Sequence, residues 1–465
     1  MLSLKSLFSA KDMTEGAPWK RILEFSVPML LGNVAQQLYN TADSVIVGLY
    51  VGDNALAAVG SASPILNLLL ALFVGIATGA GIVISQSFGA RDREGLSKNV
   101  GNCISLTLVA TVVIMVFGPL ITRPMLHLLD TPESIMEWCV EYLNIFFYGI
   151  AGFFFYNMLS GVLRGLGDSV SALGFLLLAA ALNVALDLLF VAKFGMGVPG
   201  VALATVIAQG ISAVFCYIKL MRMGDLFDLN RSTIRLDKKI SGRIISIGVP
   251  SGVTQAIMAC SMMVVQSLTN SMGEMVIAAN VIIMRVDGFA MMPNFSFGQA
   301  MSVYAGQNVG ACRYDRVHKG VGQGTAIALS FSTVITVVLL FLNKYLFAIF
   351  TETTALIDLA GQMMRIMAVG YLAVSISQVL GGIMRGMGDT VTPMWISIVS
   401  TVVLRVPIAY ILAFFTRSAE YPHGHPFSLS ISLLISWTMG MVITVIAYRF
   451  GRCRKKLQEE MKQSA

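Results

Sequence analysis

The chain has 465 residues and a formal net charge of +7, with 56% hydrophobic residues and only 12% charged ones. About a quarter of the residues of a soluble protein are charged, so this composition excludes an ordinary soluble enzyme and is typical of a chain embedded in a bilayer. The six cysteines form no C-x-x-C pair, which argues against structural zinc and a disulfide framework.

Twelve apolar segments follow one another along the chain, and each is long enough to cross about 30 Å of hydrocarbon as a helix. We therefore predict an all-α polytopic membrane protein with 12 transmembrane helices. The predicted spans are 21–48, 56–87, 98–122, 135–162, 169–193, 199–221, 243–270, 276–305, 320–343, 356–384, 390–415 and 427–450.

Lysine and arginine are distributed unevenly between the two predicted sides of the membrane. Most lie in the terminal segments, in 219–243 and in the loops on the same side, whereas the opposite loops hold only Arg123, Lys193, Lys344 and Arg417. The positive-inside rule then predicts a multi-pass protein of the plasma (inner) membrane with both termini in the cytoplasm. A basic inner surface that faces anionic lipid accounts for the net charge, so no nucleic-acid partner is expected.

The second half of the chain repeats the first at an offset of about 221 residues. Six spans are an even number, so both copies enter the membrane from the same side, and we predict two parallel six-helix repeats. Three pairs of blocks come into register: LSGVLRGLGD (159–168) with LGGIMRGMGD (380–389), RILEFSVP (21–28) with RIISIGVP (243–250), and QSFGA (86–90) with QNVGA (307–311). The predicted divisions are a cytoplasmic tail (1–20), an N-terminal lobe (21–221), a cytoplasmic linker (222–242), a C-terminal lobe (243–450) and a basic cytoplasmic tail (451–465).

A duplicated helical bundle is the usual architecture of a transporter that works by alternating access. The sequence contains no G-x-x-x-x-G-K-[ST] motif and no soluble segment long enough for a nucleotide-binding fold. An ion gradient is therefore the expected energy source, and no organic cofactor is expected.

Acidic side chains within two predicted spans mark a candidate site, because ionisable groups in lipid are costly. Asp43 ends a polar stripe on the first span that includes Gln36 and Asn40, and these residues share one helical face. The amides of this stripe could equally form hydrogen bonds between helices. Asp187 lies on the fifth span, one turn after Asn183 on the same face.

Counting from the outer ends of their spans places Asp43, Asp187 and Thr205 at a similar depth, about 8 to 9 Å below the outer surface. Matching depth allows these side chains and the Asn183 amide to meet. Two carboxylates, an amide oxygen and a hydroxyl bind Na⁺ or, with one carboxylate protonated, carry H⁺. No metal other than this Na⁺ is expected.

The second repeat contains four further charges within its spans, Arg285, Asp287, Arg365 and Arg405. A structural pair of Asp287 with Arg365 or Arg405 and a contact with substrate are the two interpretations. Pro28, on the first span, predicts a kink that is either a hinge or a static bend.

The repeated GVLRGLGD and GIMRGMGD blocks, the QSFGAR and QNVGAC blocks and the TADSVIVG segment around Asp43 resemble the multidrug and toxic compound extrusion (MATE) family over 21–450. Within that family the chain is most similar to the DinF-like branch, whose cation site lies in the N-terminal lobe. The resemblance implies that Asp43, Asn183, Asp187 and Thr205 form this site. The additional C-terminal-lobe cation site of another branch is not expected, because the seventh span carries no acid.

The leading interpretation is a secondary active exporter of amphipathic, often cationic, drug-like compounds by H⁺ or Na⁺ antiport, acting as a monomer. The substrate class is implied by the resemblance alone. A flippase for lipid-linked compounds or polysaccharides is the alternative within transport, because Arg285, Arg365 and Arg405 could line a cationic cleft. An intramembrane enzyme is disfavoured since no catalytic motif is present, and a structural or receptor role since no ectodomain is recognisable.

Overall fold

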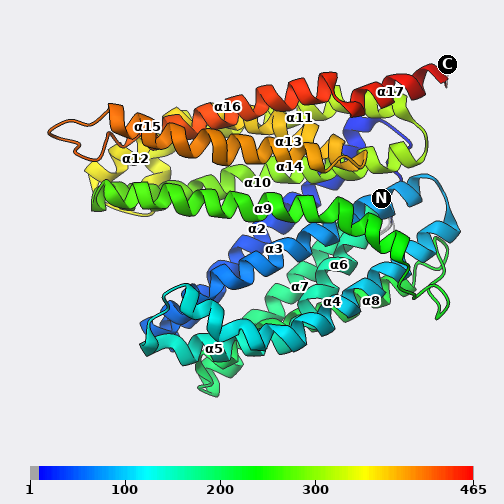
Figure 1. Cartoon of the computed structure of the whole chain (residues 1–465), viewed down its shortest axis with the longest axis horizontal. Coiled ribbons are helices and arrows are strands. Elements are labelled where there is room, and N and C mark those ends of the chain that lie inside the picture. Colours follow the sequence, from blue (N-terminus) through cyan, green and yellow to red (C-terminus); the bar gives the residue numbers. More distant parts are fainter. Residues whose placement is uncertain (1–9, 464–465) are drawn as a thin grey trace. The chain divides into compact units, whose positions relative to one another are not determined.

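The computed structural model describes residues 10–463, with the side chains of 44, 53–57, 452, 456 and 461–463 left aside. All regular elements of the described residues are helices (Figure 1). They are α2 (Pro18–Tyr50), α3 (Asp53–Gly89), α4 (Arg93–Leu128), α5 (Glu133–Tyr148), α6 (Ile150–Gly165), α7 (Ser169–Asp187), the π-helical η1 (Leu188–Lys193), α8 (Gly197–Met221), α9 (Lys238–Ser271), α10 (Glu274–Gly310), α11 (Tyr314–Ala348), α12 (Thr354–Ala368), α13 (Gly370–Gly386), α14 (Val391–Ile398), the π-helical η2 (Val399–Leu404), α15 (Arg405–Phe415), α16 (Phe427–Phe450) and α17 (Arg452–Gln463).

The prediction of twelve membrane-spanning helices is confirmed. In the described part of the chain, nine helices are long and apolar enough to cross a bilayer. Two bent pairs meet the same test when each is joined, α5 with α6 at 52° and α12 with α13 at 43°. The remaining span is α2, which is less apolar because it carries the polar stripe around Gln36 and Asn40.

The outer faces of the helices are apolar. On α4, Leu108, Val112, Val116 and Leu120 recur every four residues, and each side chain is more than half exposed. A soluble protein rarely leaves such a continuous apolar stripe in water, whereas lipid solvates it.

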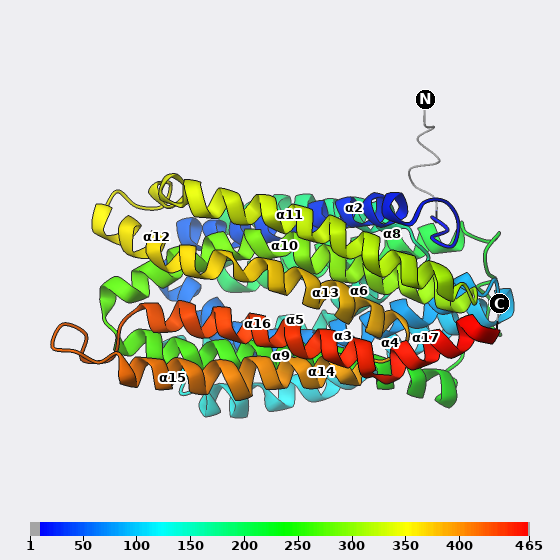
Figure 2. The same cartoon turned by 90° about the horizontal axis from the view of Figure 1, so that it is seen from above.

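The helices form two compact units, each with its own core. Unit 1 contains the residues up to Asp12 together with Val27–Gly252, and unit 2 contains Met13–Ser26 together with the residues from Val253 onward. The units differ from the lobes predicted at 21–221 and 243–450, because the first turns of α2 belong to unit 2 and those of α9 belong to unit 1. Figure 1 shows α3, α4, α6, α7 and α8 of unit 1, and Figure 2 shows α10, α11, α13 and α16 of unit 2.

The repeated Gly-Val-Leu-Arg-Gly and Gly-Ile-Met-Arg-Gly blocks bring two helices of each unit into backbone contact. In unit 1, a Cβ added at Gly165 of α6 would lie 2.5 Å from the carbonyl oxygen of Gly81 on α3. In unit 2, a Cβ at Gly386 of α13 would lie 2.3 Å from the carbonyl oxygen of Ser302 on α10. Small residues four apart are a common helix-packing device in membranes, so these glycines fix the centre of each bundle.

The same blocks also end one helix and begin the next. Gly167 has a φ of +86° and Gly388 a φ of +93°, a conformation that glycine adopts without steric cost. The following acids cap the next helices, because Asp168 accepts a hydrogen bond from the Ser171 N–H and Asp389 from the Thr392 N–H.

The two glutamines of the QSFGA and QNVGA blocks contact the first turns of α9 and the segment that leads into α2. Arg243 donates to Gln86 Oε1 at 2.6 Å in unit 1, and in unit 2 the N–H of the buried Met13 donates to Gln307 Oε1 at 2.9 Å. Part of the predicted 1–20 tail is therefore packed, and α2 begins at Pro18.

Candidate functional site

Three helices of unit 1 carry the four residues predicted to couple transport to an ion. Asp43 lies on α2, Asn183 and Asp187 lie on the last turns of α7, and Thr205 lies on α8. Asn183 and Asp187 are completely buried. The backbone becomes π-helical in η1 directly after Asp187, an irregularity that is common at functional sites.

The amide of Asn183 lies between Thr205 and Asp187. With its Nδ2 donating to Asp187 Oδ2 at 2.9 Å, its Oδ1 accepts from Thr205 Oγ1 at 3.2 Å. The opposite orientation would bring the amide oxygen against the carboxylate, two acceptors in contact. The Asn183 amide therefore orients the Asp187 carboxylate through this hydrogen bond.

The carboxyl groups of Asp43 and Asp187 lie within hydrogen-bonding reach of each other. Two carboxylates hydrogen-bond directly only when they share a proton, and otherwise a cation between them offsets their repulsion. Asp43 Oδ1 and Asp187 Oδ1 are both buried and have no protein hydrogen-bond partner. The structure thus brings the four predicted residues together and leaves two buried acidic oxygens available to an ion.

Two tyrosines belong to this cluster and were missed in the sequence. The Tyr39 hydroxyl hydrogen-bonds with Thr205, and Tyr39 and the buried Tyr142 of α5 are close enough to interact electrostatically with Asp43 and Asp187. Tyr39 lies one turn before Asp43, a spacing that could have indicated it, whereas nothing in the sequence singles out Tyr142.

The polar stripe on α2 divides into two groups. Gln36 donates to Asn40 Oδ1 at 3.3 Å, and Asn40 is exposed. Asp43 of the same stripe lies beside Asp187. Pro28 lies inside α2, next to the residue at which α2 passes from unit 2 to unit 1.

The four charges predicted within the spans of unit 2 do not form one group. Tyr371 Oη donates to Asp287 Oδ1 at 2.5 Å, and Arg405 interacts electrostatically with Asp287. Arg285 and Arg365 have exposed side chains. Among the two suggested partners of Asp287, the structure thus places Arg405 near it.

The described residues contain no group of three or more His, Cys, Asp or Glu side chains arranged to hold a metal ion. The hard oxygen donors of the Asp43–Asp187 cluster suit Na⁺, which prefers carboxylate, carbonyl and hydroxyl ligands over nitrogen and sulfur.

Comparisons with known proteins find matches to one family of transporters in both repeats of the chain. The MatE family model matches residues 28–189 and again 250–411. "Probable multidrug resistance protein YoeA" of Bacillus subtilis is 29% identical over 90% of this chain and 92% of its own length, and "Probable multidrug resistance protein YpnP" of the same species is 29% identical over 95% and 97%. A solved structure described as the outward-facing conformation of a multidrug resistance MATE family transporter has a TM-score of 0.86 at 25% identity, with 98% of this chain and 99% of that chain covered.

Proposed function

Because this chain belongs to the MatE family of membrane transporters, we propose that it is a secondary active multidrug exporter that moves amphipathic, often cationic, organic compounds out of the cell in exchange for H⁺ or Na⁺. The names of its relatives as multidrug resistance proteins support the substrate class. The assignment to the DinF-like branch is part of this proposal.

The observation that carries the proposal is the pair of adjacent carboxyl groups of Asp43 and Asp187, each with a buried oxygen that has no protein partner. An isolated buried carboxylate costs several kcal/mol, so a proton or Na⁺ is needed to neutralise the pair. Asn183 and Thr205 supply the neutral donors and acceptors around it. A site that must be occupied by one cation or the other is suited to antiport.

In the proposed cycle, occupancy of this site biases the chain between inward- and outward-facing states. A ligand shifts such an equilibrium only by its differential affinity for the two states. Asp43 lies on α2 and Asp187 on α7, so a cation shared between them ties these two helices together. Pro28, which interrupts the hydrogen-bond ladder of α2, is the proposed hinge.

The protein is a multi-pass membrane protein. We further propose a plasma-membrane location with both termini in the cytoplasm, function as a monomer, and no organic cofactor or nucleic-acid partner. The flippase alternative is not favoured, because the similar proteins are named multidrug resistance proteins.

The test is dye transport into inside-out membrane vesicles under an imposed pH or Na⁺ gradient. At 4 Å and an effective dielectric constant of about 20, one carboxylate attracts a cation by about 4 kcal/mol, so Asp187→Asn removes most of the ion affinity. We expect at least a tenfold lower gradient-driven rate for Asp187→Asn and for Asn183→Ala.

Asp358→Asn is the matched control. Asp358 is an exposed acid on α12 that pairs with Lys344 at 2.6 Å, far from the cluster in sequence and in unit 2. Its amide variant should transport like the unmodified chain. Unchanged transport by well-expressed Asp187→Asn and Asn183→Ala would contradict the proposed coupling site.

A further inference from the structure

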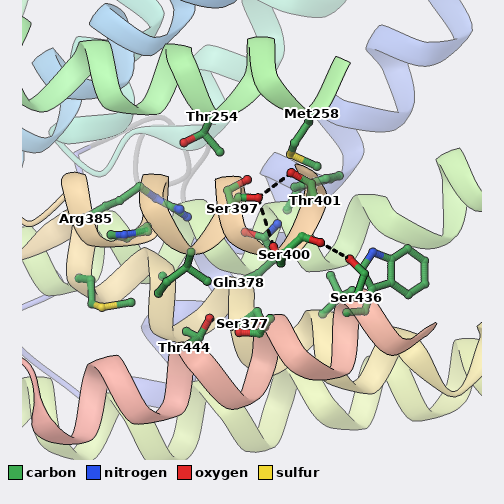
Figure 3. A pocket seen from close by; sticks show the side chains of 18 of the residues that line it. Thr254, Met258, Ser377, Gln378, Arg385, Ser397, Ser400, Thr401, Ser436 and Thr444 are labelled. Carbon is green, nitrogen blue, oxygen red and sulfur yellow. Dashed lines mark hydrogen bonds between the residues drawn. The ribbon is translucent and has the colours of Figure 1, made fainter. Parts of the chain in front are cut away.

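Unit 2 contains a cavity of about 150 Å³ between α9, α10, α13, α14, η2 and α16. Thr254, Ser377, Gln378, Ser397 and Thr444 contribute polar side chains to its wall, and Phe295 and Trp437 contribute aromatic ones. Figure 3 shows Arg385 at one end of this cavity, and Ser397, Ser400 and Ser436 further along it toward the other end. A cavity of this volume accommodates a molecule about the size of benzene.

Among the described residues that line the cavity, Arg385 is the single charged one. Among the described residues, its guanidinium makes no hydrogen bond and no ion pair, and no acid lies close enough to interact with it electrostatically. Arg385 is half-buried, and a charge that is partly withdrawn from water without a partner is destabilising. The guanidinium of Arg385 is therefore available to bind an anion.

A comparison of the two repeats shows that this arrangement around the arginine is specific to unit 2. In unit 1 the equivalent residue is Arg164, which donates to Ser160 Oγ at 3.1 Å, and Ser160 in turn hydrogen-bonds with the buried Tyr156. At the register of the repeat, Gly381 replaces Ser160 and Ser377 replaces Tyr156. The second repeat thus has neither the serine that hydrogen-bonds with the arginine in unit 1 nor the large tyrosine beside it. Gly381 and Ser377, which stand at these positions, both line the cavity.

The opposite wall of the cavity is held rigid by hydrogen bonds to the π-helical turn. The Ser400 carbonyl accepts from Ser436 Oγ at 2.7 Å, and the Thr401 carbonyl accepts from Ser261 Oγ at 2.6 Å. These bonds anchor η2 to α16 and to α9. A rigid polar wall opposite an arginine is preorganised for a ligand, which lowers the entropic cost of binding.

We propose that this cavity binds the carboxylate or phosphate group of a small amphipathic molecule, with Arg385 as the anion-binding residue and the aromatic side chains in contact with the apolar part. Guanidinium binds both anions through two parallel hydrogen bonds, and the side-chain amide of Gln378 in the cavity wall is a further donor. The anionic group can belong to a soluble organic acid or to a lipid headgroup. This inference goes beyond the cation-coupled export proposed above, because it concerns a different unit and can be tested without transport.

The experiment is calorimetric titration of the purified full-length protein in neutral detergent with sodium benzoate, and with benzamide as its uncharged analogue. We expect saturable binding of benzoate and at least tenfold weaker binding of benzamide, because a hydrogen bond to a charged partner is lost. Arg385→Gln should weaken benzoate binding by at least tenfold. Arg164→Gln, which removes the equivalent arginine that Ser160 already occupies, should bind benzoate like the unmodified protein.

A second variant keeps Arg385 but gives its guanidinium a hydrogen-bond partner within the protein. A Cβ at Gly381 would lie 3.4 Å from Arg385 Nη1, an ordinary contact distance, and no other atom lies within 4 Å. Gly381→Ser therefore recreates the serine of the first repeat beside the arginine, and it should also lower benzoate affinity. This variant keeps the inference testable if Arg385→Gln does not fold.

The lipid source is tested separately by native mass spectrometry of the protein released from nanodiscs of phosphatidylglycerol or phosphatidylcholine. Retention of phosphatidylglycerol that is lost in Arg385→Gln and kept in Arg164→Gln supports a headgroup as the ligand, whereas Arg385-dependent benzoate binding supports a soluble acid. Equal behaviour of Arg385→Gln, Arg164→Gln and the unmodified protein in both arms would overturn the proposal. So would equal affinity for benzoate and benzamide without Arg385-dependent lipid retention.

Discussion

The glycine contact between α3 and α6 leads to a quantitative prediction. In Gly165→Ala the new Cβ would lie 2.5 Å from the Gly81 carbonyl oxygen and 3.0 Å from Ile84 Cβ. A carbon and a carbonyl oxygen are in contact at about 3.3 Å, so the helices must separate by most of an ångström. Overpacking of this kind costs about 1 to 3 kcal/mol, and the better helix propensity of alanine offsets up to about 1 kcal/mol of it.

With the full offset, a net loss of up to about 2 kcal/mol remains, which should lower the unfolding temperature of the purified protein by up to about 8 °C, measured by intrinsic fluorescence during a thermal ramp. Gly60→Ala is the matched control on α3, because no described atom outside the local backbone of α3 lies within 4 Å of a Cβ at that position. It should leave the unfolding temperature unchanged or raise it slightly. Gly386→Ala, the equivalent of Gly165→Ala in unit 2, should be at least as destabilising, since its Cβ would lie 2.3 Å from the Ser302 carbonyl oxygen.

The comparison between Gly165→Ala and Gly60→Ala decides the point. An unfolding temperature of Gly165→Ala equal to or above that of Gly60→Ala would refute close backbone packing as the role of the repeated glycines. The blocks would then be a mark of common ancestry with no packing function.

Three further predictions concern coupling, orientation and the linker. The pH dependence of substrate affinity should be present in the unmodified protein and absent in Asp43→Asn, because the variant cannot share a proton with Asp187; equal dependence in both would move the coupling switch elsewhere. A cysteine placed at Ser232, between α8 and α9, should resist an impermeant thiol reagent in intact cells, and strong labelling there would overturn the cytoplasmic assignment of the linker. Hydrogen bonds from Arg93 hold the pKa of the Asp228 carboxyl below its usual range, so this link is fully present above about pH 4 and is lost as the pH falls further; the protection of the segment between α8 and α9 against hydrogen exchange, taken relative to the intrinsic rate at each pH, should fall in that range in the unmodified protein and stay constant in Asp228→Asn.

Much of the candidate site could be predicted because its residues are exceptions to a local rule. An acid in a long apolar helix is conspicuous in the sequence, and counting turns from the helix ends places Asp43, Asp187 and Thr205 at similar depth. Tyr39 and Tyr142 could not be found in this way, because tyrosine is unremarkable in a membrane helix and only the packing of α2, α5 and α8 shows that they reach the carboxyl groups.

The role proposed for Arg385 in the unit 2 cavity could not be predicted from the sequence either, although its repeated block is conspicuous there. In the sequence, Arg385 is one of many basic residues on the predicted cytoplasmic side, and its block indicates the repeat and the family resemblance but no ligand. Arg164 donates a hydrogen bond to Ser160, whereas Arg385 lines a cavity. This difference depends on which side chains lie beside each arginine in three dimensions.

The sequence by itself determined the twelve spans, the duplication and the presence of acids in the membrane, because hydropathy and helical periodicity are properties of each segment alone. Only the tertiary structure decided that the first turns of α2 and α9 belong to different units from the rest of those helices, that the glycines of the repeat bring backbones into contact, and that one arginine of the repeated pair lines a cavity. These features depend on the volumes of side chains that are far apart in the chain, and such volumes leave no periodic signal in any one helix.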